Sequence, residues 1–263
     1  MTSKSLLIVL TMFLFGCAST TVHSNPVTAP QEPAQVVGTD MGLAWSSSVA
    51  GIETASTAGD ELIIVRVDAK QAPLVLLNPP ETNGRSVREN ADANGLALAI
   101  NAAMFGSDYQ TSIGYMRNYQ TINNGHYATR LKGYLLFNPK NPKSAAVKIA
   151  EKDDPNYQTV FQTHRMWTPA LGILWNQGAH AYFQVALVGV DSKNRALFFY
   201  HPATIDVHDL VQSILDLNLG LKGLLYLDGG HHGVLHLAPE VGASYNAGMP
   251  LPNIIGVKPP AAE

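Results

Sequence analysis

Two polar side chains close apolar, strand-like runs where a ligand could approach the backbone. Asp228 ends one run and is followed by Gly229 and Gly230, and Asn101 ends another. Glycines after a carboxylate admit positive φ and bring backbone N–H groups close to a ligand, which suits a phosphate or a sugar hydroxyl. An Asn amide can donate to and accept from such a hydroxyl. Asp-Gly pairs and Asn also commonly form turns, so a structural role fits the same residues.

Three histidines, His231, His232 and His236, follow the two glycines and offer half of a metal site. Adjacent strand residues point to opposite faces, so His231 and His232 are not expected to share an ion, and no His-x-x-x-His spacing marks a further ligand. We expect a hydrogen-bonding or pH-sensitive role in a cleft and no cofactor; a divalent metal is the alternative, which the spacing does not support.

Six segments resemble the phosphodiester glycosidase family, which includes the uncovering enzyme, in their order and spacing. Their residue ranges are 99–105, 112–115, 161–162, 188–191, 207–219 and 225–230, so that the resemblance spans most of residues 60 to 237. It implies hydrolysis of a phosphodiester at the anomeric carbon of a sugar, with Asn101 and Asp228 in the active cleft. Asp228 would act as a base or as an electrostatic stabiliser. Gln162, Gly229, Gly230 and His232 would contact the substrate.

The sequence also departs from the family pattern. Val185 or Gln184 stands where relatives carry an arginine, and neither can clamp a phosphate. The resemblance therefore suggests that Arg165 replaces the lost cation and that His164 or His231 transfers a proton.

Asp108, on the loop that leaves Asn101, is the candidate for a second carboxylate, and a solvated loop residue is the alternative. Two functions follow from these patterns. One is an envelope hydrolase that cleaves a glycosyl phosphodiester. The other is a non-catalytic lipoprotein that binds a glycan or sugar-phosphate ligand in the same cleft.

The N-terminal residues have the pattern of a secretory signal peptide, with Lys4 before a short apolar stretch. The only cysteine, Cys17, directly follows Gly16 and resembles the acylated cysteine of a bacterial lipobox. We expect a signal peptide over residues 1–16, a lipidated, Pro-rich tether over 17–36, and a protein held by acyl chains on the periplasmic face of the outer membrane.

Residues 37–263 are expected to form a single α+β domain with a mixed multi-stranded β-sheet core and few helices. Ser86 and Glu89 have capping-box spacing and predict a helix over 87–94, and an apolar stripe after Asp206 predicts one over 207–219. Residues 138–154 are expected to be a solvated excursion. The expected strands are 61–68, 73–78, 96–101, 133–138, 170–175, 183–190, 196–200 and 224–228, with residues 191–194 as a hairpin turn.

Composition excludes some classes of protein. An apolar content of 46% with 14% charged residues describes a folded chain, because disorder needs fewer core-forming residues. Seventeen Lys and Arg against 20 Asp and Glu give a net charge of −3, so we expect no nucleic-acid partner. The sequence leaves the oligomeric state open.

Overall fold

The computed structural model describes residues 42–82 and 84–260. The predicted signal peptide, the tether and Cys17 lie outside these residues. Within the described ranges, no helix has both the length and the apolar character needed to cross a membrane.

The strands form four sheets, and every strand pair is antiparallel. The eight-stranded sheet has the order β1-β2-β3-β15-β14-β17-β11-β12, with bounds Ser46–Val49, Ile52–Ser56, Ile63–Val67, Ala196–His201, Val185–Asp191, Leu221–Asp228, Arg165–Thr168 and Gly172–Ile173. The five-stranded sheet β7-β6-β10-β8-β9 comprises Thr121–Asn124, Met116–Asn118, Tyr157–Thr163, Gly133–Pro139 and Val147–Ala150.

Two smaller sheets complete the set. The four-stranded sheet β18-β5-β19-β4 comprises Leu235–Leu237, Leu98–Asn101, Ile254–Val257 and Leu74–Leu77. The two-stranded sheet β13-β16 comprises Ala181–Tyr182 and Ile205–Asp206. The expected single mixed sheet is therefore wrong. Parallel neighbours need long crossovers, usually helical, and the described residues contain only two α-helices.

The hairpin predicted at residues 191–194 is confirmed between β14 and β15. The Asp191 carboxylate accepts hydrogen bonds from the backbone N–H groups of Lys193 and Arg195 and lies 2.7 Å from Arg195 Nε. Asn194 takes a positive φ of 60°, which Asn tolerates better than most residues. Local side chains thus fix this turn and its register.

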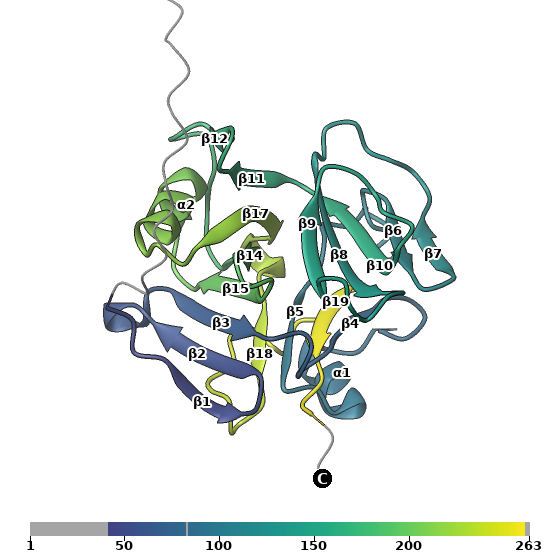
Figure 1. Cartoon of the computed structure of the whole chain (residues 1–263), viewed down its shortest axis with the longest axis horizontal. Coiled ribbons are helices and arrows are strands. Elements are labelled where there is room, and N and C mark those ends of the chain that lie inside the picture. Colours follow the sequence, from purple (N-terminus) through teal and green to yellow (C-terminus); the bar gives the residue numbers. More distant parts are fainter. Residues whose placement is uncertain (1–41, 83, 261–263) are drawn as a thin grey trace, which may run out of the picture. The chain divides into compact units, whose positions relative to one another are not determined.

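Both faces of the central strands of the eight-stranded sheet are buried. Figure 1 shows β3, β15, β14 and β17 of this sheet together with α2. On one face, alternate residues such as Val188, Phe198 and Leu225 share a core with the apolar faces of the five-stranded and four-stranded sheets. On the other face, residues such as Leu187 and Leu224 pack against the apolar stripe of α2. Because both faces are covered, the central strands are apolar at consecutive positions.

The two predicted α-helices are present. α1, Val87–Asn94, has the predicted capping box between Ser86 and Glu89 and ends at Gly95 with φ 59°. α2, Val207–Asp216, is capped by Asp206 but ends before the predicted residue 219. The backbone of Asn218 turns into the left-handed region, with φ 50°, and stops the helix before Gly220.

Two segments differ from the expectation. Only residues 172–173 of the predicted strand 170–175 pair, as β12, and the rest of that segment includes the exposed Leu171 and Leu174. Conversely, residues 138–154 contain β9, which pairs with β8 and buries Val147 in the core. Charged flanks hid this short strand. In the apolar run 170–175, Ile173 and Trp175 pack against the core while Leu171 and Leu174 are exposed.

Candidate functional site

Asp228 is the last residue of β17, and its side chain is 14% exposed. The neighbouring strand β14 and the apolar run before it hold the carboxylate at the end of the sheet. Burial raises its pKa to about 6, although a hydrogen bond from the backbone N–H of Gly229 to Oδ1, at 2.8 Å, opposes the rise. A carboxylate that titrates just below neutral pH in this setting is a candidate general base.

The turn after Asp228 is tightly held by the protein itself. The N–H of Gly229 donates to Asp228, and the N–H of Gly230 donates to the carbonyl of Phe183 at 2.6 Å. The backbone donors that the sequence offered to a ligand at these glycines are therefore used internally. Gly230 takes a positive φ of 68° as predicted, and it begins the 3-10 turn η2, Gly230–His232.

The two adjacent histidines make different contacts, although they lie in a 3-10 turn and not on a strand as the sequence analysis assumed. His232 Nδ1 lies 4.0 Å from Asp228 Oδ2, and its Nε2 lies 3.3 Å from the hydroxyl of Tyr109. The His231 ring packs edge-on against Phe183, with ring centroids 5.1 Å apart. Burial, with a smaller contribution from His231, lowers the pKa of His232. His232 therefore lies beside the carboxylate, whereas the sequence predicted a proton-transfer role for His231 or His164.

Asn101 is buried at the end of β5, in a different sheet from Asp228. The two residues expected to share a cleft therefore end strands of different sheets, yet the segments that follow them meet. Asn101 Oδ1 accepts a hydrogen bond from the N–H of Val234, just beyond the turn that follows Asp228. In return, His232 packs against Phe105, on the loop that leaves Asn101, with ring centroids 4.9 Å apart.

Two buried amides have unused donors within the described residues. The Nδ2 atoms of Asn101 and Asn253 are buried and have no hydrogen-bond partner there. Asn253 Oδ1 accepts from the N–H of Ala103, so this side chain supports the loop that follows β5. Sequence reasoning missed Asn253, because nothing in its Pro-Asn-Ile setting distinguishes it from a turn residue.

Arg165, the residue expected to replace the family's cation, is paired with a carboxylate in this structure. Its Nη1 forms an ion pair with Oε1 of Glu151, and its strand position is opposite Leu225, whose side chain belongs to the central core. His164, which the sequence analysis named with His231 as a candidate for proton transfer, is half-buried against Trp175, and burial lowers its pKa.

Gln162 is committed to the protein backbone. The residue is 1% exposed, its Nε2 donates to the carbonyls of Ala128 and Leu131, and its Oε1 accepts from the N–H groups of Tyr115 and Ala128. The side-chain amide of Gln162 therefore bonds to the backbone of Tyr115, Ala128 and Leu131, and this geometry gives the residue a structural role.

Asp108 lies on an exposed loop and caps a turn of that loop. Its Oδ2 accepts from the Thr111 hydroxyl, and its Oδ1 accepts from the N–H groups of Gln110 and Thr111; these bonds lower its pKa. It lines a cavity of about 580 Å³, and the other lining residues are Tyr109, Gln110, Pro79, Pro80, Thr82, Gly84, Pro250, Leu251 and Pro252. Tyr109 lines this cavity and also contacts His232.

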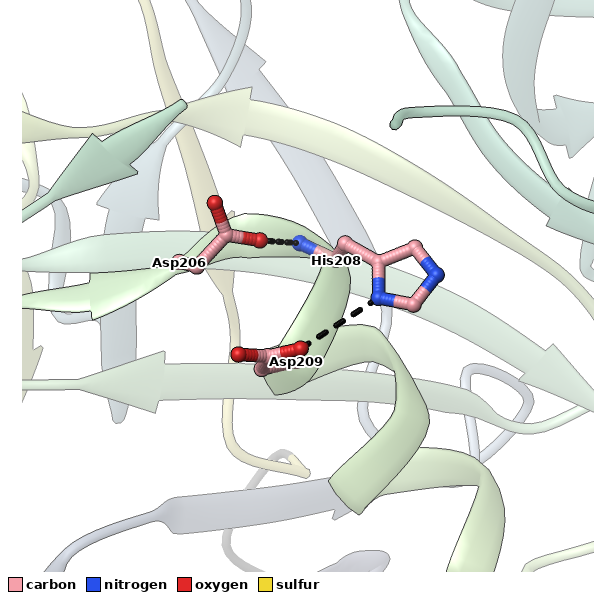
Figure 2. Close-up of side chains that lie close together, drawn as sticks. All are labelled: Asp206, His208 and Asp209. Carbon is pink, nitrogen blue, oxygen red and sulfur yellow. Dashed lines mark hydrogen bonds and ion pairs between the residues drawn. The ribbon is translucent and has the colours of Figure 1, made fainter. Parts of the chain in front are cut away.

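One group of side chains among the described residues has the spacing of metal ligands. Figure 2 shows Asp206, His208 and Asp209 at the start of α2, and their ligand atoms lie within 4.8 Å of one another. Asp206 Oδ1 caps the helix through the N–H of His208, while Asp209 Oδ1 accepts from Gln177 and lies 3.4 Å from His208 Nδ1. These contacts are those of a helix N-terminus, and we assign no metal to them.

No protein-family model matches the chain, and no curated protein matches it in sequence. Solved structures do share its fold. The catalytic domain of zebrafish N-acetylglucosamine-1-phosphodiester α-N-acetylglucosaminidase (NAGPA), auto-inhibited by its pro-peptide, has a TM-score of 0.58 at 9% identity, with 82% of this chain and 81% of that chain covered.

Two bacterial structures are also similar. A hypothetical protein from Synechocystis has a TM-score of 0.51 at 12% identity, with 82% of this chain and 61% of that chain covered. A protein of Burkholderia pseudomallei that is named as exported has a TM-score of 0.47 at 9% identity, with 81% and 76% covered. The described domain therefore has a fold that resembles the catalytic domain of NAGPA, a phosphodiester glycosidase.

Proposed function

We propose that this protein hydrolyses a sugar-1-phosphodiester and that Asp228 is the general base. The observation that carries the proposal is the Asp228 carboxylate, which burial holds at a pKa of about 6 at the end of β17. A base with this pKa is ionised at neutral pH and retains enough basicity to accept a proton from water. The fold it shares with a phosphodiester glycosidase supports the choice of substrate.

In the proposed reaction, water attacks the anomeric carbon while the bond from that carbon to the phosphate oxygen breaks. The oxygen of water forms the new bond to carbon, and one of its protons passes to Asp228. The phosphate monoester leaves as an anion and needs no proton at neutral pH. Asp228 then returns its proton to solvent, so the net reaction is addition of one water and cleavage of one C–O bond.

His232 takes the supporting role in this proposal. Its Nδ1 faces Asp228 Oδ2 at 4.0 Å, which is longer than a hydrogen bond, and burial lowers the pKa of the imidazole, so His232 stands beside the base as a neutral ring. The Tyr109 hydroxyl near Nε2 orients the ring. Asn101 has an indirect role, because its carbonyl oxygen accepts a hydrogen bond from the N–H of Val234 and so fixes the end of the turn that carries His232.

A second candidate function is binding without catalysis, of a glycan or sugar-phosphate ligand in the same place. The observation that favours it is the ion pair between Arg165 and Glu151, which engages the arginine expected to replace the family's phosphate-binding cation.

Turnover of defined substrates separates the two functions. The purified protein would be offered 4-nitrophenyl esters of α- and β-linked sugar 1-phosphates together with UDP-sugars. We expect Asp228→Asn to reduce kcat by a factor of about 10² to 10⁴, as is typical for loss of a general base. Asp92→Asn, which changes an exposed carboxylate on α1, is the matched control and should retain wild-type turnover.

The absence of turnover across this panel would contradict the hydrolase proposal. If N-acetylglucosamine 1-phosphate nevertheless binds, and Asp228→Asn weakens its binding, the non-catalytic binding function takes its place.

A further inference from the structure

A second group of rings, which does not include Phe105 or Tyr109, lies close to Asp228. The centroid of the Trp175 ring is 4.7 Å from that of His180 and 5.1 Å from that of Tyr226, and Tyr182 stacks near His180 with centroids 6.2 Å apart. We call Trp175, His180, Tyr182 and Tyr226 the aromatic platform. His164 touches its edge through Trp175.

The aromatic platform borders the Asp228 carboxylate. Tyr226 lies two residues before Asp228 on β17, and the charge of Asp228 contributes to raising the pKa of its phenol. A Cβ built on Gly229 would lie 2.7 Å from the Tyr226 hydroxyl oxygen and 3.4 Å from Tyr182 Cβ. Both tyrosines therefore line the position directly after Asp228, and a side chain at Gly229 would collide with the platform.

The platform is held in place but not covered. Tyr182 is 38% exposed, His180 is exposed and Trp175 is half-buried, while Tyr226 is buried beneath them. The residues just before Trp175 also expose two apolar side chains, those of Leu171 and Leu174. The described core does not explain why this loop presents large rings to solvent next to the candidate base.

We propose that the aromatic platform binds a pyranose ring of the ligand and holds it against Asp228. The C–H face of a pyranose stacks on aromatic rings, while its hydroxyl groups bond to imidazole nitrogens and to the carboxylate. This inference rests on the proposed function, since it identifies where the sugar of the phosphodiester lies.

The chemistry of the platform favours a sugar over a phosphate. None of its four side chains is a Lys or Arg. Burial and the neighbouring His180 lower the pKa of His164, so that this imidazole is neutral at neutral pH and acts as a hydrogen-bond partner of a hydroxyl. A phosphate group would require a cation or several free donors instead.

Fluorine NMR of the full protein labelled with 5-fluorotryptophan tests the proposal. The chain has three tryptophans, Trp45, Trp167 and Trp175, so the spectrum has three resonances and Trp175→Phe assigns the relevant one. The probes are glucose, N-acetylglucosamine and N-acetylglucosamine 1-phosphate at millimolar concentrations. We expect a saturable shift of the Trp175 resonance, with Trp45 and Trp167 as internal references. No shift with any probe, or equal shifts of all three resonances, would overturn the proposal.

Substitutions provide a second readout. Trp175→Ala and Tyr182→Ala should each weaken probe binding roughly tenfold, in keeping with the energy of one aromatic contact, whereas Tyr182→Phe keeps the ring and should bind normally. Tyr119→Ala, which removes a tyrosine 53% exposed in the turn between β6 and β7, is the matched control.

The outcomes also distinguish the two proposals. Hydrolysis with unchanged KM in both platform variants, and no Trp175 shift, would reject the platform and keep the hydrolase. A saturable Trp175 shift without hydrolysis would keep the platform and reject catalysis.

Discussion

At the scale of single residues, two opposing effects act on the Asp228 carboxylate. The hydrogen bond from the Gly229 N–H stabilises the charged form, while burial penalises it more strongly, so the pKa rises to about 6. A carboxyl that only capped a turn in solvent, as Asp108 does, has its pKa lowered instead. Of the two aspartates, Asp228 is therefore the candidate for proton transfer.

This raised pKa predicts how the stability of the protein depends on pH. The folded state binds the Asp228 proton more tightly than the unfolded state, so its contribution is complete below about pH 4 and is lost as the pH rises through about 6. Relative to Asp228→Asn, the wild type should lose up to about 3 kcal/mol of unfolding free energy between these limits. Urea denaturation of both proteins at pH 4, 5, 6 and 7 measures the difference. If the difference in unfolding free energy between the wild type and Asp228→Asn stayed the same from pH 4 to pH 7, the raised pKa would be contradicted.

At the scale of elements, the turn from Gly229 to Gly233 determines where the site residues lie. A Cβ on Gly233 would lie 1.4 Å from the carbonyl oxygen of Gln184, so only glycine fits there. Asn246 Nδ2 donates to the carbonyls of His231 and Gly233 and holds the turn from the other side.

Several residues around the same turn have unusual backbone conformations. Three non-glycine residues that contact it, Tyr109, Gln184 and Asn246, have positive φ values of 54° to 55°. Such conformations persist only where the surroundings impose them, and they are common at functional sites.

Gly233→Ala should therefore be severely destabilising. The added methyl group overlaps the Gln184 backbone, which cannot move away as a flexible side chain would, and we expect a loss of more than about 4 kcal/mol or failure to fold. Gly248→Ala is the matched control, because nothing lies within 4 Å of its Cβ position. Thermal and urea unfolding of both variants measures the effect, and equal stability of the two would show that the turn is not constrained as described.

At the scale of the whole molecule, the candidate site depends on two sheets. Asp228 comes from the eight-stranded sheet and Asn101 from the four-stranded sheet, and both sheets contribute to one core. The loops that leave β5 and β17 meet through His232, Phe105 and Val234. Loss of packing between the sheets would therefore separate the two halves of the site without changing either strand.

Attachment to a membrane is a prediction about the chain as a whole. Cys17, which lies outside the described residues, should carry acyl chains if the lipobox interpretation is right, and the protein would then act in the envelope, at the outer membrane. Cells grown with an alkyne fatty-acid analogue should label the wild-type protein and not Cys17→Ala. Equal labelling of both proteins, or labelling of neither, would contradict the interpretation.

The sequence by itself determined the features that local interactions control. The capping box of Ser86 and Glu89 predicted α1, the Asp191 turn predicted the β14–β15 hairpin, and Asp228 was identified as the polar end of a buried strand. Each depends on residues within a few positions of one another. Periodicity and turn chemistry are therefore sufficient to identify them.

Only the tertiary structure decided which distant groups meet. It placed His232 rather than His231 beside Asp228, paired Arg165 with Glu151, enclosed Gln162 among backbone groups, and brought Trp175 onto Tyr226. The orientation of a 3-10 turn, and the partner of a charged side chain, depend on how three sheets pack around one core. No spacing along the chain encodes that packing, because the energies that fix it come from contacts between residues far apart in sequence.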